Sequence, residues 1–272
     1  MKTLTIYSFV FCAILSICFS IAIGQPNAFA EDLFKTANDL RAKPDPESAI
    51  TYYERAAIEF SKNGNTEKAI DSYNQIGTIL NRQDKYAQAK EYLEKALALG
   101  RASKDPESLV VATTYITLGV TYGAENNFEE SLNYHNKALS IRLAKLGKNN
   151  ADVATSYGNI GNVHFRMKEY ERAIQAHLKA KQIREKVFGK HGVEVEQSYR
   201  NLGNAYREKR EYKSSLSNYK KALAIKMSQL GPGHKDLVRY YKSISELYGL
   251  MGDKSRSDEY RIKGEEIENL AL

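Results

Sequence analysis

The sequence predicts an all-α solenoid of about six helix-turn-helix units. The first observation behind this is a 42-residue period of tyrosines. The second is a glycine four residues after each of these tyrosines, except in the last unit, where Ser245 takes its place. A fixed period of this length indicates an array of stacked units that share a continuous core. The tyrosines are Tyr73, Tyr115, Tyr157, Tyr199 and Tyr241.

The central unit shows why each repeat should contain two helices. Tyr157, Ile160 and Gly161 recur at the spacing of one helical face, which predicts a first helix over about 152–166. A second apolar face with the same spacing predicts another helix over about 170–187. The small Gly161 should let these two helices approach closely. A second set of glycines, again 42 residues apart, should end the second helices in the left-handed conformation: Gly147, Gly189 and Gly231.

The order of aromatic, aliphatic, glycine and alanine positions in each unit resembles the tetratricopeptide repeat. The period is 42 residues, whereas that family usually has 34. The longer form, with KALSIRLAKLGKNNADVATSYGNIG and KALAIKMSQLGPGHKDLVRYYKSIS, is similar to the repeats of kinesin light chains and their bacterial relatives. The resemblance covers nearly all of residues 31–272. It implies a helical solenoid but names no partner, because this repeat serves many.

The repeats divide the chain into three parts after its N-terminal segment. Residues 31–65 form an irregular first unit, 66–234 carry the regular repeats, and 235–272 form a degenerate last unit. In the last unit Arg261 stands where the preceding unit has Tyr219. A terminal repeat has one face without a neighbour, so we expect 235–272 to act as a polar cap.

The N-terminal segment, residues 1–30, has the pattern of a secretory signal peptide. Lys2 precedes an apolar run over 4–23, and Ala28-Phe-Ala30 is a small-residue cleavage site. We therefore expect cleavage after Ala30 and a location outside the cytoplasm. The protein should be periplasmic or secreted. The alternative is an uncleaved membrane anchor, since the apolar run is about long enough to span a bilayer. Both cysteines lie in this segment, so the mature chain should have no disulfide or thiol chemistry.

Charge and motifs exclude several classes of function. The formal charge is +7, but no basic run alternates with aromatic residues, which favours a solvated helix surface over nucleic-acid binding. The chain has no glycine-rich phosphate loop, HExxH, CxxC or GxSxG motif, so we expect no enzyme, no cofactor and no small-molecule substrate. His135, His164 and His177 fall on the apolar faces of their helices, which favours core histidines over a metal site.

The remaining candidate is a surface that binds a protein or peptide. In tetratricopeptide arrays the first helices line a concave groove, and the matching positions here are polar in the C-terminal half. Asparagine can bond a peptide backbone, and the planar fork of arginine suits carboxylates. We predict a peptide-binding site formed by Asn159, Asn162, Arg166, Arg200, Asn201, Asn204, Arg207, Arg239 and Lys242.

The charges of this predicted site favour an acidic partner. Its arginines and lysine should form a basic strip, with Glu246 as the main acidic exception. Some members of the family grip a terminal carboxylate through five side chains, and only Asn162, Asn201 and Arg239 match here, so that clamp is incomplete. The alternative function is a structural scaffold that acts by self-association or through its convex surface. The groove positions of the N-terminal half are nearly neutral: Asn74, Thr78, Thr117 and Val120.

Overall fold

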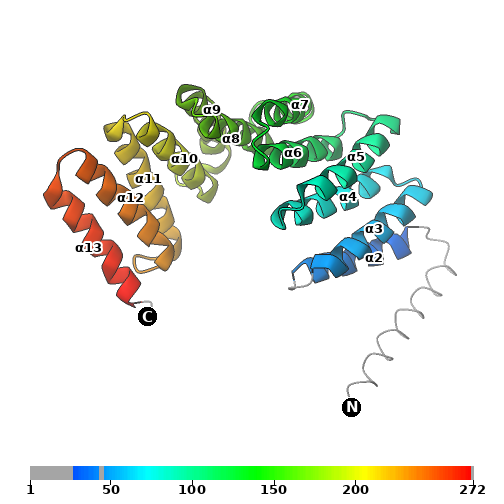
Figure 1. Ribbon diagram of the computed structural model, residues 1–272, viewed down its shortest axis with the longest axis horizontal. Coiled ribbons are helices and arrows are strands. Elements are labelled where there is room, and N and C mark those ends of the chain that lie inside the picture. Colours follow the sequence, from blue (N-terminus) through cyan, green and yellow to red (C-terminus); the bar gives the residue numbers. More distant parts are fainter. Residues whose placement is uncertain (1–26, 43–45, 271–272) are drawn as a thin grey trace, which may run out of the picture. The chain divides into compact units, whose positions relative to one another are not determined.

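The computed structural model describes residues 27–42 and 46–270 (Figure 1). Within these ranges the chain forms twelve α-helices and one short 3-10 helix, with no strand, so the expected all-α class is confirmed. The apolar run over 4–23 lies outside the described residues. Among the helices that are described, none combines the length and apolar character needed to cross a membrane.

The chain divides into two compact units, Met1–Tyr134 and His135–Leu272, which we call the N-terminal and C-terminal units. The boundary falls within α7 (Phe128–Leu146). Every predicted pair of helices in the regular repeats is present. The other helices of the N-terminal unit are α2 (Ala28–Arg41), α3 (Pro46–Lys62), α4 (Thr66–Arg82), α5 (Tyr86–Ala102) and α6 (Leu109–Ala124).

In the C-terminal unit, first and second helices alternate along the chain (Figure 1). The central pair matches the predicted bounds to within one residue at each end. First helices are α8 (Ala151–Arg166), α10 (Val193–Glu208) and α12 (Val238–Leu250), the last preceded by η1 (Lys235–Leu237). Second helices are α9 (Tyr170–Phe188), α11 (Tyr212–Leu230) and α13 (Lys254–Leu270).

Each first helix from α4 to α12, including that of the last unit, ends in the same left-handed turn. The residue in the turn has positive φ, and the N–H after it donates to a carbonyl five residues back, as Glu169 does to His164 at 2.9 Å. This backbone bond is the one that closes a Schellman motif. Glycine is not required for it, because four of the five residues at this position are not glycine: Asp84, Asn126, Lys168, Arg210 and Gly252.

The two helices of a repeat approach most closely at the predicted glycine. A Cβ atom added to Gly161 would lie 2.6 Å from Cε1 of His177, and one on Gly203 would lie 2.8 Å from Cδ2 of Tyr219. Gly77 meets the side chain of Leu93 in the same way. The facing residue therefore varies, while the glycine provides the space that each of them fills.

The irregular first unit is joined to the second by the turn that is used inside repeats. Gly64 has φ 74°, and the N–H of Asn65 donates to the carbonyl of Phe60 at 2.8 Å. Helix α2 begins before the predicted boundary at residue 31, and Ala30 is fully buried in a cluster with Phe60. The structure thus includes in its first helix three residues that the sequence assigned to the removed segment.

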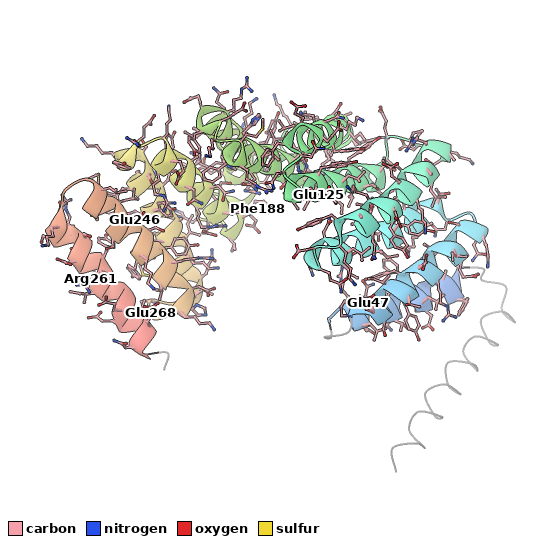
Figure 2. The ribbon with its side chains drawn as sticks, viewed as in Figure 1. Glu47, Glu125, Phe188, Glu246, Arg261 and Glu268 are labelled. Carbon is pink, nitrogen blue, oxygen red and sulfur yellow. The ribbon has the colours of Figure 1, made fainter. Side chains whose placement is uncertain are left out.

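Most residues of the last helix, α13, are exposed, and only a narrow face of it is buried. Gly264 and Ile267 are buried, and the ring of Tyr260 lies 5.5 Å from that of Tyr248. Arg261 is exposed and pairs with Glu265 on its own helix at 2.7 Å (Figure 2). Arg261 and Glu265, two charged residues at the degenerate positions, thus pair with each other on the exposed side of α13.

We predict that Gly161→Leu destabilises the protein far more than Lys168→Leu. The added side chain would collide with the ring of His177, and overpacking of this kind costs about 1–3 kcal/mol. Lys168 is exposed and already has φ 61°, so leucine there changes neither packing nor backbone strain appreciably. Urea denaturation of both variants measures the difference, and equal unfolding midpoints would contradict the helix contact.

Candidate functional site

The predicted binding residues lie on the three first helices of the C-terminal unit. Helix α8 carries three of them, α10 carries four and α12 carries two. Residues three or four apart share one face of a helix, which brings each group together. Two side-chain contacts then join neighbouring helices: Asn201 Nδ2 donates to Asn162 Oδ1 at 3.3 Å, and Arg207 Nη1 donates to Glu246 Oε2 at 3.0 Å. We call the surface formed by these residues of α8, α10 and α12 the first-helix face.

Three cations of this face, Arg200, Arg207 and Lys242, already contact carboxylates of the same chain. Arg207 pairs with Glu246, the acidic exception noted in the sequence, and also with Glu208 at 3.2 Å. Lys242 Nζ lies 2.7 Å from Glu268 Oε1 on α13; both glutamates are labelled in Figure 2. The expectation of a basic strip with few acidic neighbours is therefore wrong for these residues. Their charge is largely balanced within the unit.

Arg200 and Arg239 contact two buried residues, Glu196 and Tyr240. Arg200 Nε lies 3.5 Å from Glu196 Oε1, and the hydroxyl of Tyr240 donates to the same glutamate. Arg239 donates to the Tyr240 oxygen at 3.1 Å. Burial, followed by the neighbouring Glu196, raises the pKa of Tyr240 to about 12. The tyrosine thus stays protonated and links α12 to α10.

Asn204 serves the packing of its own repeat. Its Oδ1 accepts a hydrogen bond from the hydroxyl of Tyr219, which is 3% exposed. The carbonyl oxygen of Asn204 is therefore engaged within the repeat, and only its amide nitrogen is left for the predicted bond to a peptide backbone. Asn162 is exposed, and Asn159 and Asn201 are half-buried, so all three amides are partly or fully accessible to a ligand.

In the N-terminal unit two predicted groove residues are buried. Asn74 is 1% exposed, and its Nδ2 donates to the carbonyl of Val110 at 3.2 Å. Thr117 is 8% exposed and donates to the carbonyl of Thr113. These positions were mapped by repeat register, but α4 and α6 pack against each other, and both residues lie in that contact. Val120, in contrast, is 46% exposed.

The histidines are part of the core, as the sequence indicated. His135 and His177 are each 2% exposed, and burial, followed by a nearby arginine, lowers the pKa of both to about 4. His164 is partly buried, and its Nδ1 lies 2.7 Å from Glu169 Oε2. Within the part of the chain that the structure describes, no three His, Cys, Asp or Glu residues converge as metal ligands.

Two buried arginines were not anticipated. Arg142 and Arg184 stand 42 residues apart, and each donates to a serine of the following first helix: Ser156 Oγ at 3.0 Å and Ser198 Oγ at 2.7 Å. Burial lowers the pKa of both guanidinium groups. They join each second helix to the next repeat. The shared 42-residue spacing of arginine and serine was the available signal.

This arrangement of helix pairs, close-packed at glycine and joined by short turns, defines an α-solenoid of repeated helix-turn-helix units. The family model of the tetratricopeptide repeat matches residues 68–144 and 152–228, which together exceed half of the chain. The chain belongs to the tetratricopeptide repeat family. Proteins with this fold generally serve as scaffolds for protein–protein interaction and are typically non-enzymatic.

Solved structures share the fold at low sequence identity. BtubC (BKLC) from P. vanneervenii has a TM-score of 0.71 and 16% identity, over 89% of this chain and 92% of that one. A putative kinesin light chain from Podosopora anserina has a TM-score of 0.66 and 14% identity, over 75% and 96%. MamA has a TM-score of 0.53 and 22% identity, over 72% and 96%. No curated protein sequence matches the chain.

We predict that the buried histidines make the fold sensitive to mild acid. Because the folded-state pKa of His177 is about 4 and the usual value is 6.5, the unfolded chain binds more protons between these pH values. The contribution of each buried histidine to the free energy of unfolding is therefore fully present above about pH 6.5. It is lost as the pH drops towards 4, by up to about 3 kcal/mol per histidine. His177→Leu should flatten this dependence, since Leu93 fills the equivalent place beside Gly77.

Urea denaturation at about pH 7 and about pH 5 measures the effect. The matched control is His191→Leu, because His191 is exposed in a loop and its replacement leaves the core unchanged. A His177→Leu variant that loses as much stability between the two pH values as the wild type would contradict the assignment.

Proposed function

We propose that this protein is an adaptor that binds an extended segment of a partner protein across the first-helix face of its C-terminal unit. The observation that carries the proposal is the hydrogen bond between Asn201 and Asn162, which joins the accessible faces of α10 and α8. With Asn159 beside them, these amides present donors and acceptors from two successive repeats to one ligand.

The amides suit recognition of a peptide backbone. The bond between Asn201 and Asn162 is long at 3.3 Å, and it lies at the surface. Exchanging such a bond for bonds to a peptide N–H and C=O changes the free energy little, because exposed hydrogen bonds have small net values. Backbone recognition would then tolerate different side chains in the bound segment.

Acidic residues in the partner would have to compete for most of the cations. Arg207 contacts Glu246, and Lys242 contacts Glu268. A partner carboxylate would have to replace one of these glutamates, so the binding free energy would contain only the difference between two similar ion pairs. Arg239 is exposed and donates a hydrogen bond to the hydroxyl of Tyr240. Because this hydroxyl is neutral, the contact does not balance the charge of the arginine. We assign any preference of this face for acidic segments mainly to Arg239.

The test uses random twelve-residue peptides displayed on phage and selected on the purified protein. Peptides that bind the wild type should lose about tenfold in affinity on the variant Asn159→Ala, Asn162→Ala, Asn201→Ala, as expected from about 0.5 kcal/mol for each lost hydrogen bond. The matched control replaces three exposed amides on second helices, Asn136, Gln175 and Asn269, by alanine, and should bind normally.

The competing function is a scaffold that self-associates. Phe188 at the end of α9 is 38% exposed, with Val187 and Val193 also exposed (Figure 2). If every selected peptide binds the amide variant as tightly as the wild type, the first-helix face is not the binding site. A concentration-dependent dimer in analytical ultracentrifugation would then favour self-association.

We also propose that the protein is exported and that its repeats are of the kinesin-light-chain-like, 42-residue type. The signal pattern of residues 1–30 supports export, and the recurring turn positions, 42 residues apart, support the repeat type. Cleavage after Ala30 would shorten α2 by three residues and remove Ala30 from its buried cluster.

We predict that N-terminal sequencing of the protein from its native cells finds Glu31 as the first residue. The small-residue site that ends at Ala30 motivates this expectation. Intact-mass measurement of the periplasmic or secreted fraction gives an independent reading of the same cleavage. Recovery of Met1 on a chain that sediments with membranes would instead establish the anchor.

A further inference from the structure

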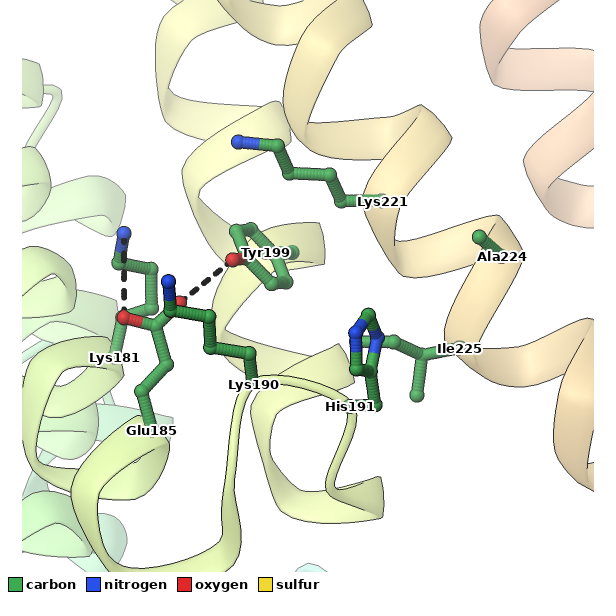
Figure 3. Close-up of a pocket in the computed structure, with 8 residues that line it drawn as sticks. All are labelled: Lys181, Glu185, Lys190, His191, Tyr199, Lys221, Ala224 and Ile225. Atoms are coloured by element: carbon green, nitrogen blue, oxygen red, sulfur yellow. Dashed lines mark hydrogen bonds and ion pairs between the residues drawn. The ribbon is translucent and has the colours of Figure 1, made fainter.

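Two cavities of the C-terminal unit have the same construction and lie one repeat apart. The first has a volume of about 440 Å³ and contains Tyr199, Lys190 and Lys221 (Figure 3). The second, of about 280 Å³, contains Tyr157, Lys148 and Lys179. Each of these residues is 42 positions from its counterpart. We call them the tyrosine–lysine pockets.

The repeat architecture explains how each pocket is built. A tyrosine of a first helix lies between two successive second helices, and a lysine of the later one lies over its ring. The Lys221 Nζ is 5.4 Å from the ring centre of Tyr199, and Lys179 Nζ is 5.2 Å from that of Tyr157. The loop after the earlier second helix supplies the remaining lysine of each pocket.

Both pockets have an excess of positive charge. The lining of the smaller one has three lysines, with Lys186 as the third, and no carboxylate. The larger one has three lysines and His191 against a single carboxylate, that of Glu185. This glutamate accepts a hydrogen bond from the Tyr199 hydroxyl at 2.7 Å and lies 3.7 Å from Lys181. A concave surface with charges of one sign concentrates ligands of the opposite sign.

We propose that the two tyrosine–lysine pockets each receive an acidic side chain from one extended segment of a partner protein. The pockets recur along the solenoid, so they suit a linear ligand that carries regularly spaced anionic groups. Neighbouring packed helices lie about 8–10 Å apart, and second helices of adjacent repeats are one or two such steps apart. An extended chain covers this distance in about three to six residues.

A protein segment is the occupant because its aspartate and glutamate side chains reach from a backbone into pockets of this size. The lysines act as point charges and impose no bidentate geometry, which suits single carboxylates. This site is additional to the first-helix face and uses none of its residues. The two proposals can therefore fail separately.

The probe is a fluorescein-labelled peptide with glutamate at every fourth position and glycine or serine elsewhere. Its counterpart has glutamine in place of glutamate. Fluorescence anisotropy should show that only the glutamate peptide binds, more weakly at about 150 mM than at about 20 mM salt, because exposed charges are screened. The variant Lys148→Gln, Lys190→Gln should bind it roughly three- to tenfold more weakly, since each exposed ion pair contributes about 0.2–1 kcal/mol.

The matched control is Lys235→Gln, Lys254→Gln, which removes the same charge from exposed positions outside the pockets and should bind as the wild type does. Equal weakening in both double variants would overturn the proposal, because it would show attraction to net charge alone. Binding of the glutamine peptide with equal affinity would do the same. A polyphosphate chain that binds when the glutamate peptide does not would assign the pockets to a phosphate polymer and also overturn it.

The amide variant of the first-helix face separates the two sites. Asn159→Ala, Asn162→Ala, Asn201→Ala should leave the affinity for the glutamate peptide unchanged. If this variant loses the peptide while the pocket variant keeps it, the acidic segment lies on the first-helix face and the pocket assignment fails.

Discussion

The close approach of two helices at one glycine is the constraint on which each regular repeat depends. Glycine is required at positions 161 and 203 because the rings of His177 and Tyr219 occupy the space that a Cβ atom would need. The residue that faces the glycine can be a leucine, a histidine or a tyrosine. The contact therefore requires a side chain that fills the space, whatever its chemical type. A buried imidazole in this place must remain neutral, which is why a packing requirement makes this protein sensitive to acid.

Most of the fold could be predicted because its signals are local and recur. A tyrosine, a glycine four residues later and a second glycine at the end of the repeat locate both helices to within a few residues. The left-handed turns at Lys168 and Arg210 could not be found in this way, because neither residue favours positive φ. The backbone bond that closes each turn accompanies that conformation, and it forms with several different residue types at the turn position.

The binding surface was less predictable because its charges depend on contacts between repeats. The repeat register correctly indicated that Asn162 and Asn201 share a face. The position of each residue on its own helix follows from helical spacing. It could not show that Glu268 reaches Lys242 from α13, or that Asn74 is covered by α6. Each of these contacts joins residues more than 25 positions apart in the sequence, beyond the reach of a pattern within one helix.

The smaller tyrosine–lysine pocket differs from the first-helix face in charge balance, because no carboxylate lines it. Successive first helices carry glutamates within reach of Arg200 and Arg207. In the smaller pocket around Tyr157, the second helix α7 carries Leu143 where α9 of the next repeat carries Glu185. A leucine cannot neutralise a lysine, so the positive charge of that pocket remains to be balanced by solvent ions or by a ligand. Displacing loosely held ions costs a ligand less than separating an ion pair, which makes this pocket the stronger anion site of the two.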